Sequence, residues 1–351
     1  MTTTRQGNQI LRMLPGVGLS VVAILALIWQ VNWRETLQAW GHARLWVMAP
    51  AVVFIVCAML TRAVAWRLLM RNTVPPGKAF WTLNISYMLN SFLPFRLGDI
   101  ARAYLISRRG GEGAGSAGGN KTDVASEPPP IDGGTALSAV ALERVFDLMY
   151  TALFILLAFP LLSGKVLNGW VLLSSFGLAA AGFLGLWLLG ALRARIMHAA
   201  ERAAQKVPIV RPGLKPLGHF LDGLRQMRAL RYSLPAFFLI GLTMLLWAAD
   251  YWVVLRGFFP DAAVYWGLLS MVGGLIGVAL PSSPAALGVF EVSLTVVLTA
   301  AGMNREAAVA YALSLHMLNT LTISLLGLLG LLTQRQSLGS ILSVARSTEN
   351  P

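Results

Sequence analysis

The stretch AAVYWGLLSMVGGLIGVALPSSPAALGVFEVSLTVVLTAAGMN, residues 262–304, decides the fold, because Glu291 is its one charged residue. A continuous helix over these 43 residues would measure about 65 Å, roughly twice the hydrocarbon thickness of a bilayer. Glycine permits unusual dihedrals and proline removes a backbone donor, so we expect the helix to break around Gly273, Gly274, Gly277, Pro281 and Pro284. The run therefore predicts a helix that turns within or beyond a membrane.

The composition of the whole chain agrees with a membrane protein. Of its 351 residues, 56% are hydrophobic and only 12% are charged, a balance that would leave a soluble domain insoluble. Six uncharged runs are each long enough for one spanning helix: 13–33, 45–61 with an extension toward 70, 148–164, 166–192, 232–249 and 307–334. We predict an all-α polytopic protein with about six full transmembrane helices and two broken or re-entrant segments.

The first broken segment is expected between Ala79 and Ser107, where an apolar run reaches Pro94 and charged residues follow. Pro94-Phe95-Arg96-Leu97-Gly98 shares the pattern P-x-x-L-G with the stretch from Pro284 to Gly288. Two further pairs repeat in the same order along the chain. Arg71 and Pro75 in the first half correspond to Arg256 and Pro260 in the second. Arg144 and Asp147 correspond in the same way to His316 and Asn319. Such weak internal repetition is typical of transporters built from two inverted halves.

The predicted organisation is one membrane domain over residues 1–340, with a first half at about 12–164 and a second half at about 166–334. Residues 106–135, rich in glycine and proline, are expected to be disordered. Nine lysines and arginines between 193 and 232 mark a basic cytoplasmic loop. Loop charge then places both termini, the 106–135 loop and the 193–232 loop in the cytoplasm of a bacterial-type inner membrane.

Charged residues inside apolar segments are the candidates for function. Each costs at least ~2.5 kcal/mol in the hydrocarbon, so it must face protein, water or a lipid head group; Asp250 is one such charge. The candidate head-group ligands are Arg96, Asp99, Arg102, Glu143, Arg144, Asp147, Glu291, His316 and Asn319, and the candidate helix breaks are Pro94, Gly98, Pro281, Pro284 and Gly288. Arginine suits bidentate binding of phosphate. The alternative is that these charges neutralise one another and lock the helix bundle.

Other chemistry has little support in the sequence. The four histidines are scattered without the spacing of a metal site, no G-x-x-x-x-G-K-[ST] motif occurs, and no serine stands in a recognisable triad. The net charge of +13 resides in loops rather than on a basic face for nucleic acid. We therefore expect no catalytic residue, metal, cofactor or nucleic-acid partner.

Three blocks carry a family resemblance. SYMLNSFLPFRLGDIARAYL at 86–105, LERVFD at 142–147 and LGVFE at 287–291 resemble, in order, the signatures of the flippase-like, lysylphosphatidylglycerol synthase transmembrane family. The resemblance implies a broken-helix inner-membrane protein linked to phospholipid, aminoacyl-lipid or isoprenoid-lipid traffic. In the bifunctional relatives an aminoacyl-transferase domain follows the membrane part, whereas this sequence ends soon after Gln334, so we do not expect it to aminoacylate lipids alone.

Two functional hypotheses follow. The first is a lipid flippase or transporter in which a polar groove between the halves takes an anionic or zwitterionic head group while the tails stay in the bilayer. The second is a non-catalytic membrane subunit that presents lipid to a lipid-synthesising transferase. Leaflet exchange by the pure protein would favour the first hypothesis, and product formation that needs an activated donor would favour the second.

Overall fold

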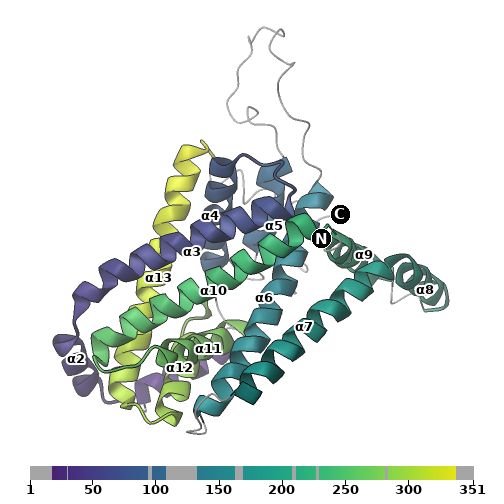
Figure 1. Ribbon diagram of the computed structural model, residues 1–351. Helices are drawn as coiled ribbons and strands as arrows, with labels where there is room; N and C mark the ends of the chain where they lie inside the picture. The colour runs from purple at the N-terminus through teal and green to yellow at the C-terminus, as the bar shows by residue number, and fades with distance from the viewer. Residues whose placement is uncertain are drawn as a thin grey trace, which may run out of the picture.

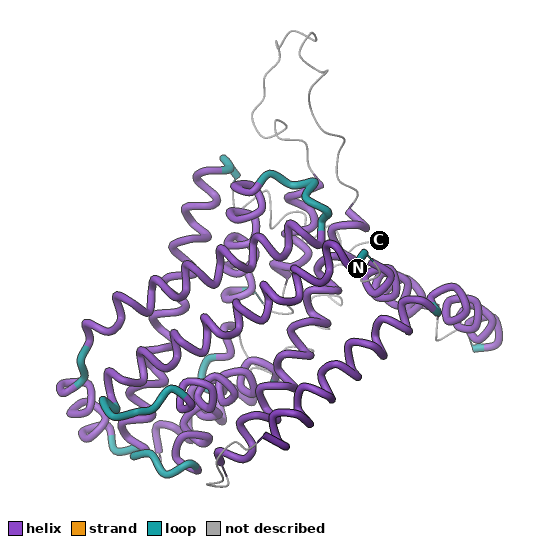
Figure 2. Tube along the Cα trace, viewed as in Figure 1, coloured by secondary structure: helices purple, strands orange, loops and turns teal. Residues whose placement is uncertain are grey.

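The computed structural model describes residues 18–29, 31–93, 97–107, 133–162, 169–207, 211–226, 229–280 and 284–336. Helices and short loops make up this part of the chain, and it contains no strand (Figure 2). After an N-terminal helix, Gly18–Trp29, the helices are α2 (Trp33–His42), η1 (Leu45–Val47), α3 (Met48–Leu69), α4 (Pro76–Phe92), α5 (Leu97–Ser107), α6 (Gly133–Leu162), α7 (Gly169–Ala191), α8 (Arg193–Lys206), α9 (Arg211–Gln226), α10 (Leu230–Phe258), α11 (Tyr265–Ala279), η5 (Pro284–Ala286), α12 (Val289–Ala300) and α13 (Arg305–Thr333).

Three helical segments within the described residues are long and apolar enough to cross a membrane: Leu45–Leu69, Leu230–Phe258 and Arg305–Thr333. A fourth is counted if Ala180–Ala191 and Arg193–Gln205, which are bent by 66° relative to each other, form one span. The predicted all-helical, multi-pass class is therefore confirmed.

Both predicted breaks are present. The apolar run 262–304 divides into α11 and α12 with η5 between them, and the first segment divides into α4 and α5. The two limbs of each pair pack against each other. In Figure 1 the α4–α5 pair lies toward one end of the bundle and the α11–α12 pair toward the other. The short helix η5 packs against α4, so parts of the two broken segments meet inside the bundle.

The long helices join the two broken segments into one body. α3 and α10 run side by side (Figure 1), and the hydroxyls of Thr61 and Thr243 lie 2.8 Å apart between them. α13 packs against α4, and α6 packs against α11, so each broken segment contacts a helix of the other half. Buried apolar side chains form one cluster centred on α10 to α13 and another centred on α3, α6, α9 and α10.

Some boundaries differ from the expectations. α6 begins at Gly133 rather than near 148, because the charged residues that interrupted its apolar run have partners inside the protein. The described parts of 193–232 form two helices, α8 and α9, rather than an irregular loop. Residues 106, 107 and 133–135 are helical, and residues 108–132 lie outside the described residues.

Candidate functional site

Six charged side chains from α3, α5 and α6 come together in the first half. Following their contacts gives a closed cycle in which acids and arginines alternate, and we call this cycle the charge ring. Its members in order are Arg62, Glu143, Arg102, Asp99, Arg144 and Asp147. The ring contains three arginines and three acids, so it is electrically balanced.

The inner side of the ring is buried. Arg62 donates from Nε to Glu143 Oε1 at 2.7 Å and from its terminal nitrogen to Asp147 Oδ2. The second oxygen of Glu143 lies 2.9 Å from a terminal nitrogen of Arg102. The Arg102 guanidinium also stands 4.7 Å from the ring centroid of Trp66. Because Arg62, Arg102 and Glu143 expose 3% of their side chains or less, they are enclosed by protein.

The outer side of the ring is more open. Arg144 contacts Asp99 at 2.7 Å and Asp147 at 3.3 Å, and Arg102 lies 4.0 Å from Asp99. Asp99 also accepts a hydrogen bond from the Asn90 side chain at 3.2 Å. The exposed side-chain fraction is 28% for Arg144, against 13% for Asp99 and 15% for Asp147. Arg144 is therefore the arginine of the ring that an external ligand reaches most directly.

The geometry supports the neutralisation hypothesis for the inner side. A buried ion is tolerated when opposite charges and hydrogen bonds surround it, and here every acid contacts two arginines. Arg102, which the sequence suggested as a head-group ligand, pairs with Glu143. None of its guanidinium nitrogens completes a hydrogen bond of good geometry among the described residues, so its binding capacity is only partly used.

The second-half candidates form a smaller cluster between α12 and α13. Glu291 Oε1 lies 2.6 Å from His316 Nδ1, and Glu291 Oε2 accepts a hydrogen bond from the backbone N–H of Gly288 at 2.8 Å. Glu291 thereby stabilises the N-terminus of α12, a position where a negative charge is favoured. Asn319, one turn beyond His316, interacts with the carboxylate of Asp250 on α10.

The two predicted glycine breaks are places of close packing. A Cβ at Gly98 would lie 2.1 Å from the backbone oxygen of Ser86, so only glycine lets α5 approach α4 this closely. Gly288 has φ +81°, and a Cβ there would lie 2.7 Å from Ile24 of the N-terminal helix. Pro284 begins η5, whereas Pro94, Arg96 and Pro281 lie outside the described residues.

Sequence reasoning missed Arg62, which joins two acids of the ring. It stands almost alone as a charge in the apolar run of α3, and that isolation was the signal that would have identified it. Asp250 was recognised as an intramembrane charge but was not assigned to a site.

The fold and the ring together define a multi-pass helical membrane protein with an ordered group of charges next to a broken helix. Residues 13–327 match the family described as Lysylphosphatidylglycerol synthase TM region. The chain belongs to this family, and it is a membrane protein related to lipid modification or transport. Neither the search of curated proteins nor the search of solved structures gave a match.

Proposed function

We propose that this protein is a lipid flippase or lipid transporter that handles the head group of a phospholipid, aminoacyl-lipid or isoprenoid-lipid at the outer side of the charge ring. One observation carries the proposal: Arg144 is partly exposed and lies between Asp99 and Asp147, directly beside the α4–α5 break. Its planar fork matches a phosphate, and it is held in place by two acids. The lipid is anionic or zwitterionic.

In this proposal the inner and outer sides of the ring have different roles. Arg62, Arg102 and Glu143 fix α3, α5 and α6 relative to one another. Arg144 exchanges one of its carboxylate partners for the lipid phosphate. Of the two candidate head-group ligands Arg102 and Arg144, Arg144 contacts the phosphate directly, and Arg102 contributes positive charge from the buried side of the ring.

The architecture supports an inverted repeat with about six full spans. Each half runs through a helix, a second helix, a broken pair and a last helix: the N-terminal helix, α3, α4–α5 and α6, then α7, α10, α11–α12 and α13. An acid of the broken segment contacts the last helix in both halves, through Asp99 with Arg144 and through Glu291 with His316. We place both termini in the cytoplasm of a bacterial-type inner membrane, following the positive-inside rule.

The test is leaflet exchange by the purified protein in liposomes that contain fluorescent phosphatidylglycerol and neither nucleotide nor an activated donor. We expect the wild-type chain to exchange the lipid and Arg144→Lys, which keeps the charge but loses the fork, to exchange it at least several-fold more slowly. Arg193→Gln serves as the control, because it removes a surface ion pair with Asp222 that lies outside the charge ring. Equal exchange by wild-type and Arg144→Lys protein would refute the assignment.

The family description favours one alternative, since it names the membrane region of a synthase. In that case the chain presents lipid to a separate transferase and is not itself an enzyme. The pure protein would then exchange no lipid, but adding membranes that contain the transferase and its activated donor would yield modified lipid, and Arg144→Lys would reduce that yield.

A further inference from the structure

The second half contains a buried acid to which no cation among the described residues is hydrogen-bonded. Asp250, on α10, has no exposed surface, and neither of its carboxylate oxygens completes a hydrogen bond of good geometry within the described part of the chain. Asn319 on α13 interacts with it, and the amide oxygen of Asn319 is likewise buried without a hydrogen-bond partner there. An ionised carboxylate in this position would be poorly stabilised.

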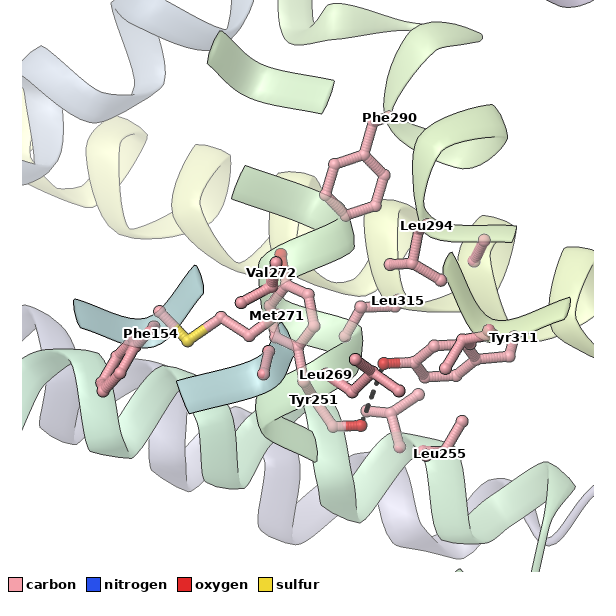
Figure 3. Packing of buried hydrophobic residues seen from close by; sticks show 14 of the residues in the cluster. Phe154, Tyr251, Leu255, Leu269, Met271, Val272, Phe290, Leu294, Tyr311 and Leu315 are labelled. Atoms are coloured by element: carbon pink, nitrogen blue, oxygen red, sulfur yellow. Dashed lines mark hydrogen bonds between the residues drawn. The ribbon is translucent and has the colours of Figure 1, made fainter. Parts of the chain in front are cut away.

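The segment of α10 that contains Asp250 packs into an apolar cluster. Its neighbour Tyr251 belongs to the cluster drawn in Figure 3, where Phe290, Leu294 and Leu315 from α12 and α13 pack nearby. Tyr311 of α13 donates its hydroxyl to the backbone oxygen of Tyr251 at 3.0 Å (Figure 3).

The charged and titratable groups on the neighbouring helices do not supply the missing cation. The phenols of Tyr251 and Tyr311 are buried and cannot carry a positive charge. Arg62, on α3, already binds Glu143 and Asp147. The other charged or titratable groups on the described helices that pack against α10 are Arg34, Glu35 and His42 of α2, Cys57 and Arg67 of α3, Arg144 and Tyr150 of α6, Tyr265 of α11, and Arg305, Glu306 and His316 of α13. Neither carboxylate oxygen of Asp250 has a hydrogen bond from any of them.

The cluster of Asp250, Asn319, Glu291 and His316 differs from the charge ring in its balance of acids and bases. Where the ring balances three acids with three arginines, the second-half cluster has the acids Asp250 and Glu291, and within the described part of the chain the one basic side chain in contact with either acid is His316. His316 and Asn319 stand one turn apart on α13, so the two acid contacts are adjacent. The cluster reaches neutrality only by taking up protons or another small cation.

We propose that Asp250, with Asn319 and the Glu291–His316 pair, is a proton-loading site that couples a proton gradient to lipid movement; this inference rests on the proposed transport function. A proton from the acidic compartment adds to the Asp250 carboxylate, and the neutral acid then donates a hydrogen bond to the amide oxygen of Asn319. Release of the same proton to the other compartment restores the carboxylate, so the cycle is balanced. A proton needs no set of ligands, and the described residues contain no group of three or more His, Cys, Asp or Glu side chains that could hold a metal ion.

The first measurement does not depend on transport. Infrared difference spectra of the pure chain over a pH titration report the carbonyl stretch of a protonated carboxyl group. We expect a band from a buried acid in the wild-type protein, its loss in Asp250→Asn, and its retention in Glu35→Gln, which removes an exposed acid of α2. If Asp250→Asn does not fold, Asp250→Glu keeps the carboxyl and should shift the band. A band that neither variant alters overturns the proposal.

The second measurement is lipid exchange in proteoliposomes with and without a pH gradient. We expect the gradient to accelerate exchange several-fold in wild-type and Glu35→Gln protein and to have no effect in Asp250→Asn. Wild-type exchange that is independent of the pH gradient overturns proton coupling. Exchange that stops when choline replaces sodium at fixed pH also overturns it. If the wild-type protein exchanges no lipid under any condition, the proposed transport function fails, whereas the infrared band still decides whether Asp250 binds a proton.

Discussion

At the scale of single residues, the charge ring explains how three arginines and three acids are accommodated inside an apolar bundle. Each carboxylate is shared by two guanidinium groups, so the loss of one residue affects two contacts. The loss of stability that a substitution causes depends on how deeply the side chain is buried. Glu143 is enclosed by protein, whereas Arg144 is partly exposed. Substitutions on the inner side should therefore reduce stability, and substitutions on the outer side should affect function.

Glu143→Gln tests the structural role of the inner side. The change removes the charge that Arg62 and Arg102 share and leaves two buried guanidinium groups undercompensated. We expect a loss of about 3 to 5 kcal/mol in the free energy of unfolding, measured by denaturant unfolding in detergent. Arg193→Gln, which breaks a half-exposed pair with Asp222, should cost at most about 1 kcal/mol. Similar losses for the two variants would contradict the buried ring.

The double variant Arg144→Asp with Asp147→Arg tests whether the two residues form an isolated pair. The sequence spacing alone suggests that swapping their charges preserves the contact. In the structure, however, the new acid would face Asp99 and the new arginine would face Arg62. We expect the double variant to unfold at lower temperature than either Arg144→Gln or Asp147→Asn. Thermal stability equal to the wild type would show that the ring is not closed.

Part of this ring was predictable from sequence and part was not. Asp99, Arg102, Glu143, Arg144 and Asp147 stand out because charges are rare in apolar segments. Their pairing was not predictable, since it depends on how α3, α5 and α6 cross. The contact between Arg144 and Asp147 follows from i, i+3 helical spacing, whereas the contact between Arg62 and Glu143 spans 81 residues.

At the scale of helices, the broken segments were predictable because length and composition determine them. A run of 43 nearly uncharged residues is too long for one crossing, and its glycines and prolines mark the break. α6 begins earlier than predicted because the charged residues before 148, which interrupt the apolar run, are paired inside the protein. The basic residues of 193–232 predict a loop on one side of the membrane, whereas the helices α8 and α9 follow from the amphipathic spacing of the same segment.

Gly98→Ala tests the close packing within the first broken segment. The added Cβ would lie 2.1 Å from Ser86 O and 2.6 Å from Asn90 Oδ1, so α5 must move away from α4. We expect a loss of at least about 1 to 3 kcal/mol in the free energy of unfolding. Gly77→Ala, in the first turn of α4, meets no atom within 4 Å and should be neutral or slightly stabilising. The same denaturant titration applies to both, and equal stabilities would refute the close approach.

At the scale of the whole molecule, corresponding contacts appear in both halves although their charges differ. Arg62 of α3 binds Asp147 of α6, and Asp250 of α10 interacts with Asn319 of α13. The sequence indicated the correspondence of the last helices through matched spacing. It did not indicate that the buried acids are balanced by arginines in the first half but not in the second. This difference arises because Arg62 has no counterpart of the same charge in the second half. That asymmetry is what gives the two halves different proposed roles.

Site-directed labelling tests the proposed orientation of the halves. If they are inverted, the turn between α3 and α4 and the helix α8 lie in the cytoplasm, and the turn between α10 and α11 lies outside. Single cysteines at Thr73, Ala199 and Asp261, all exposed positions, would be introduced into a Cys57→Ala chain. An impermeant thiol reagent added to intact cells should label only the cysteine at position 261, and inverted vesicles should give the opposite result. Labelling of positions 73 and 261 from the same side would mean that the halves are not inverted, because α3 and α10 would then end on the same side of the membrane.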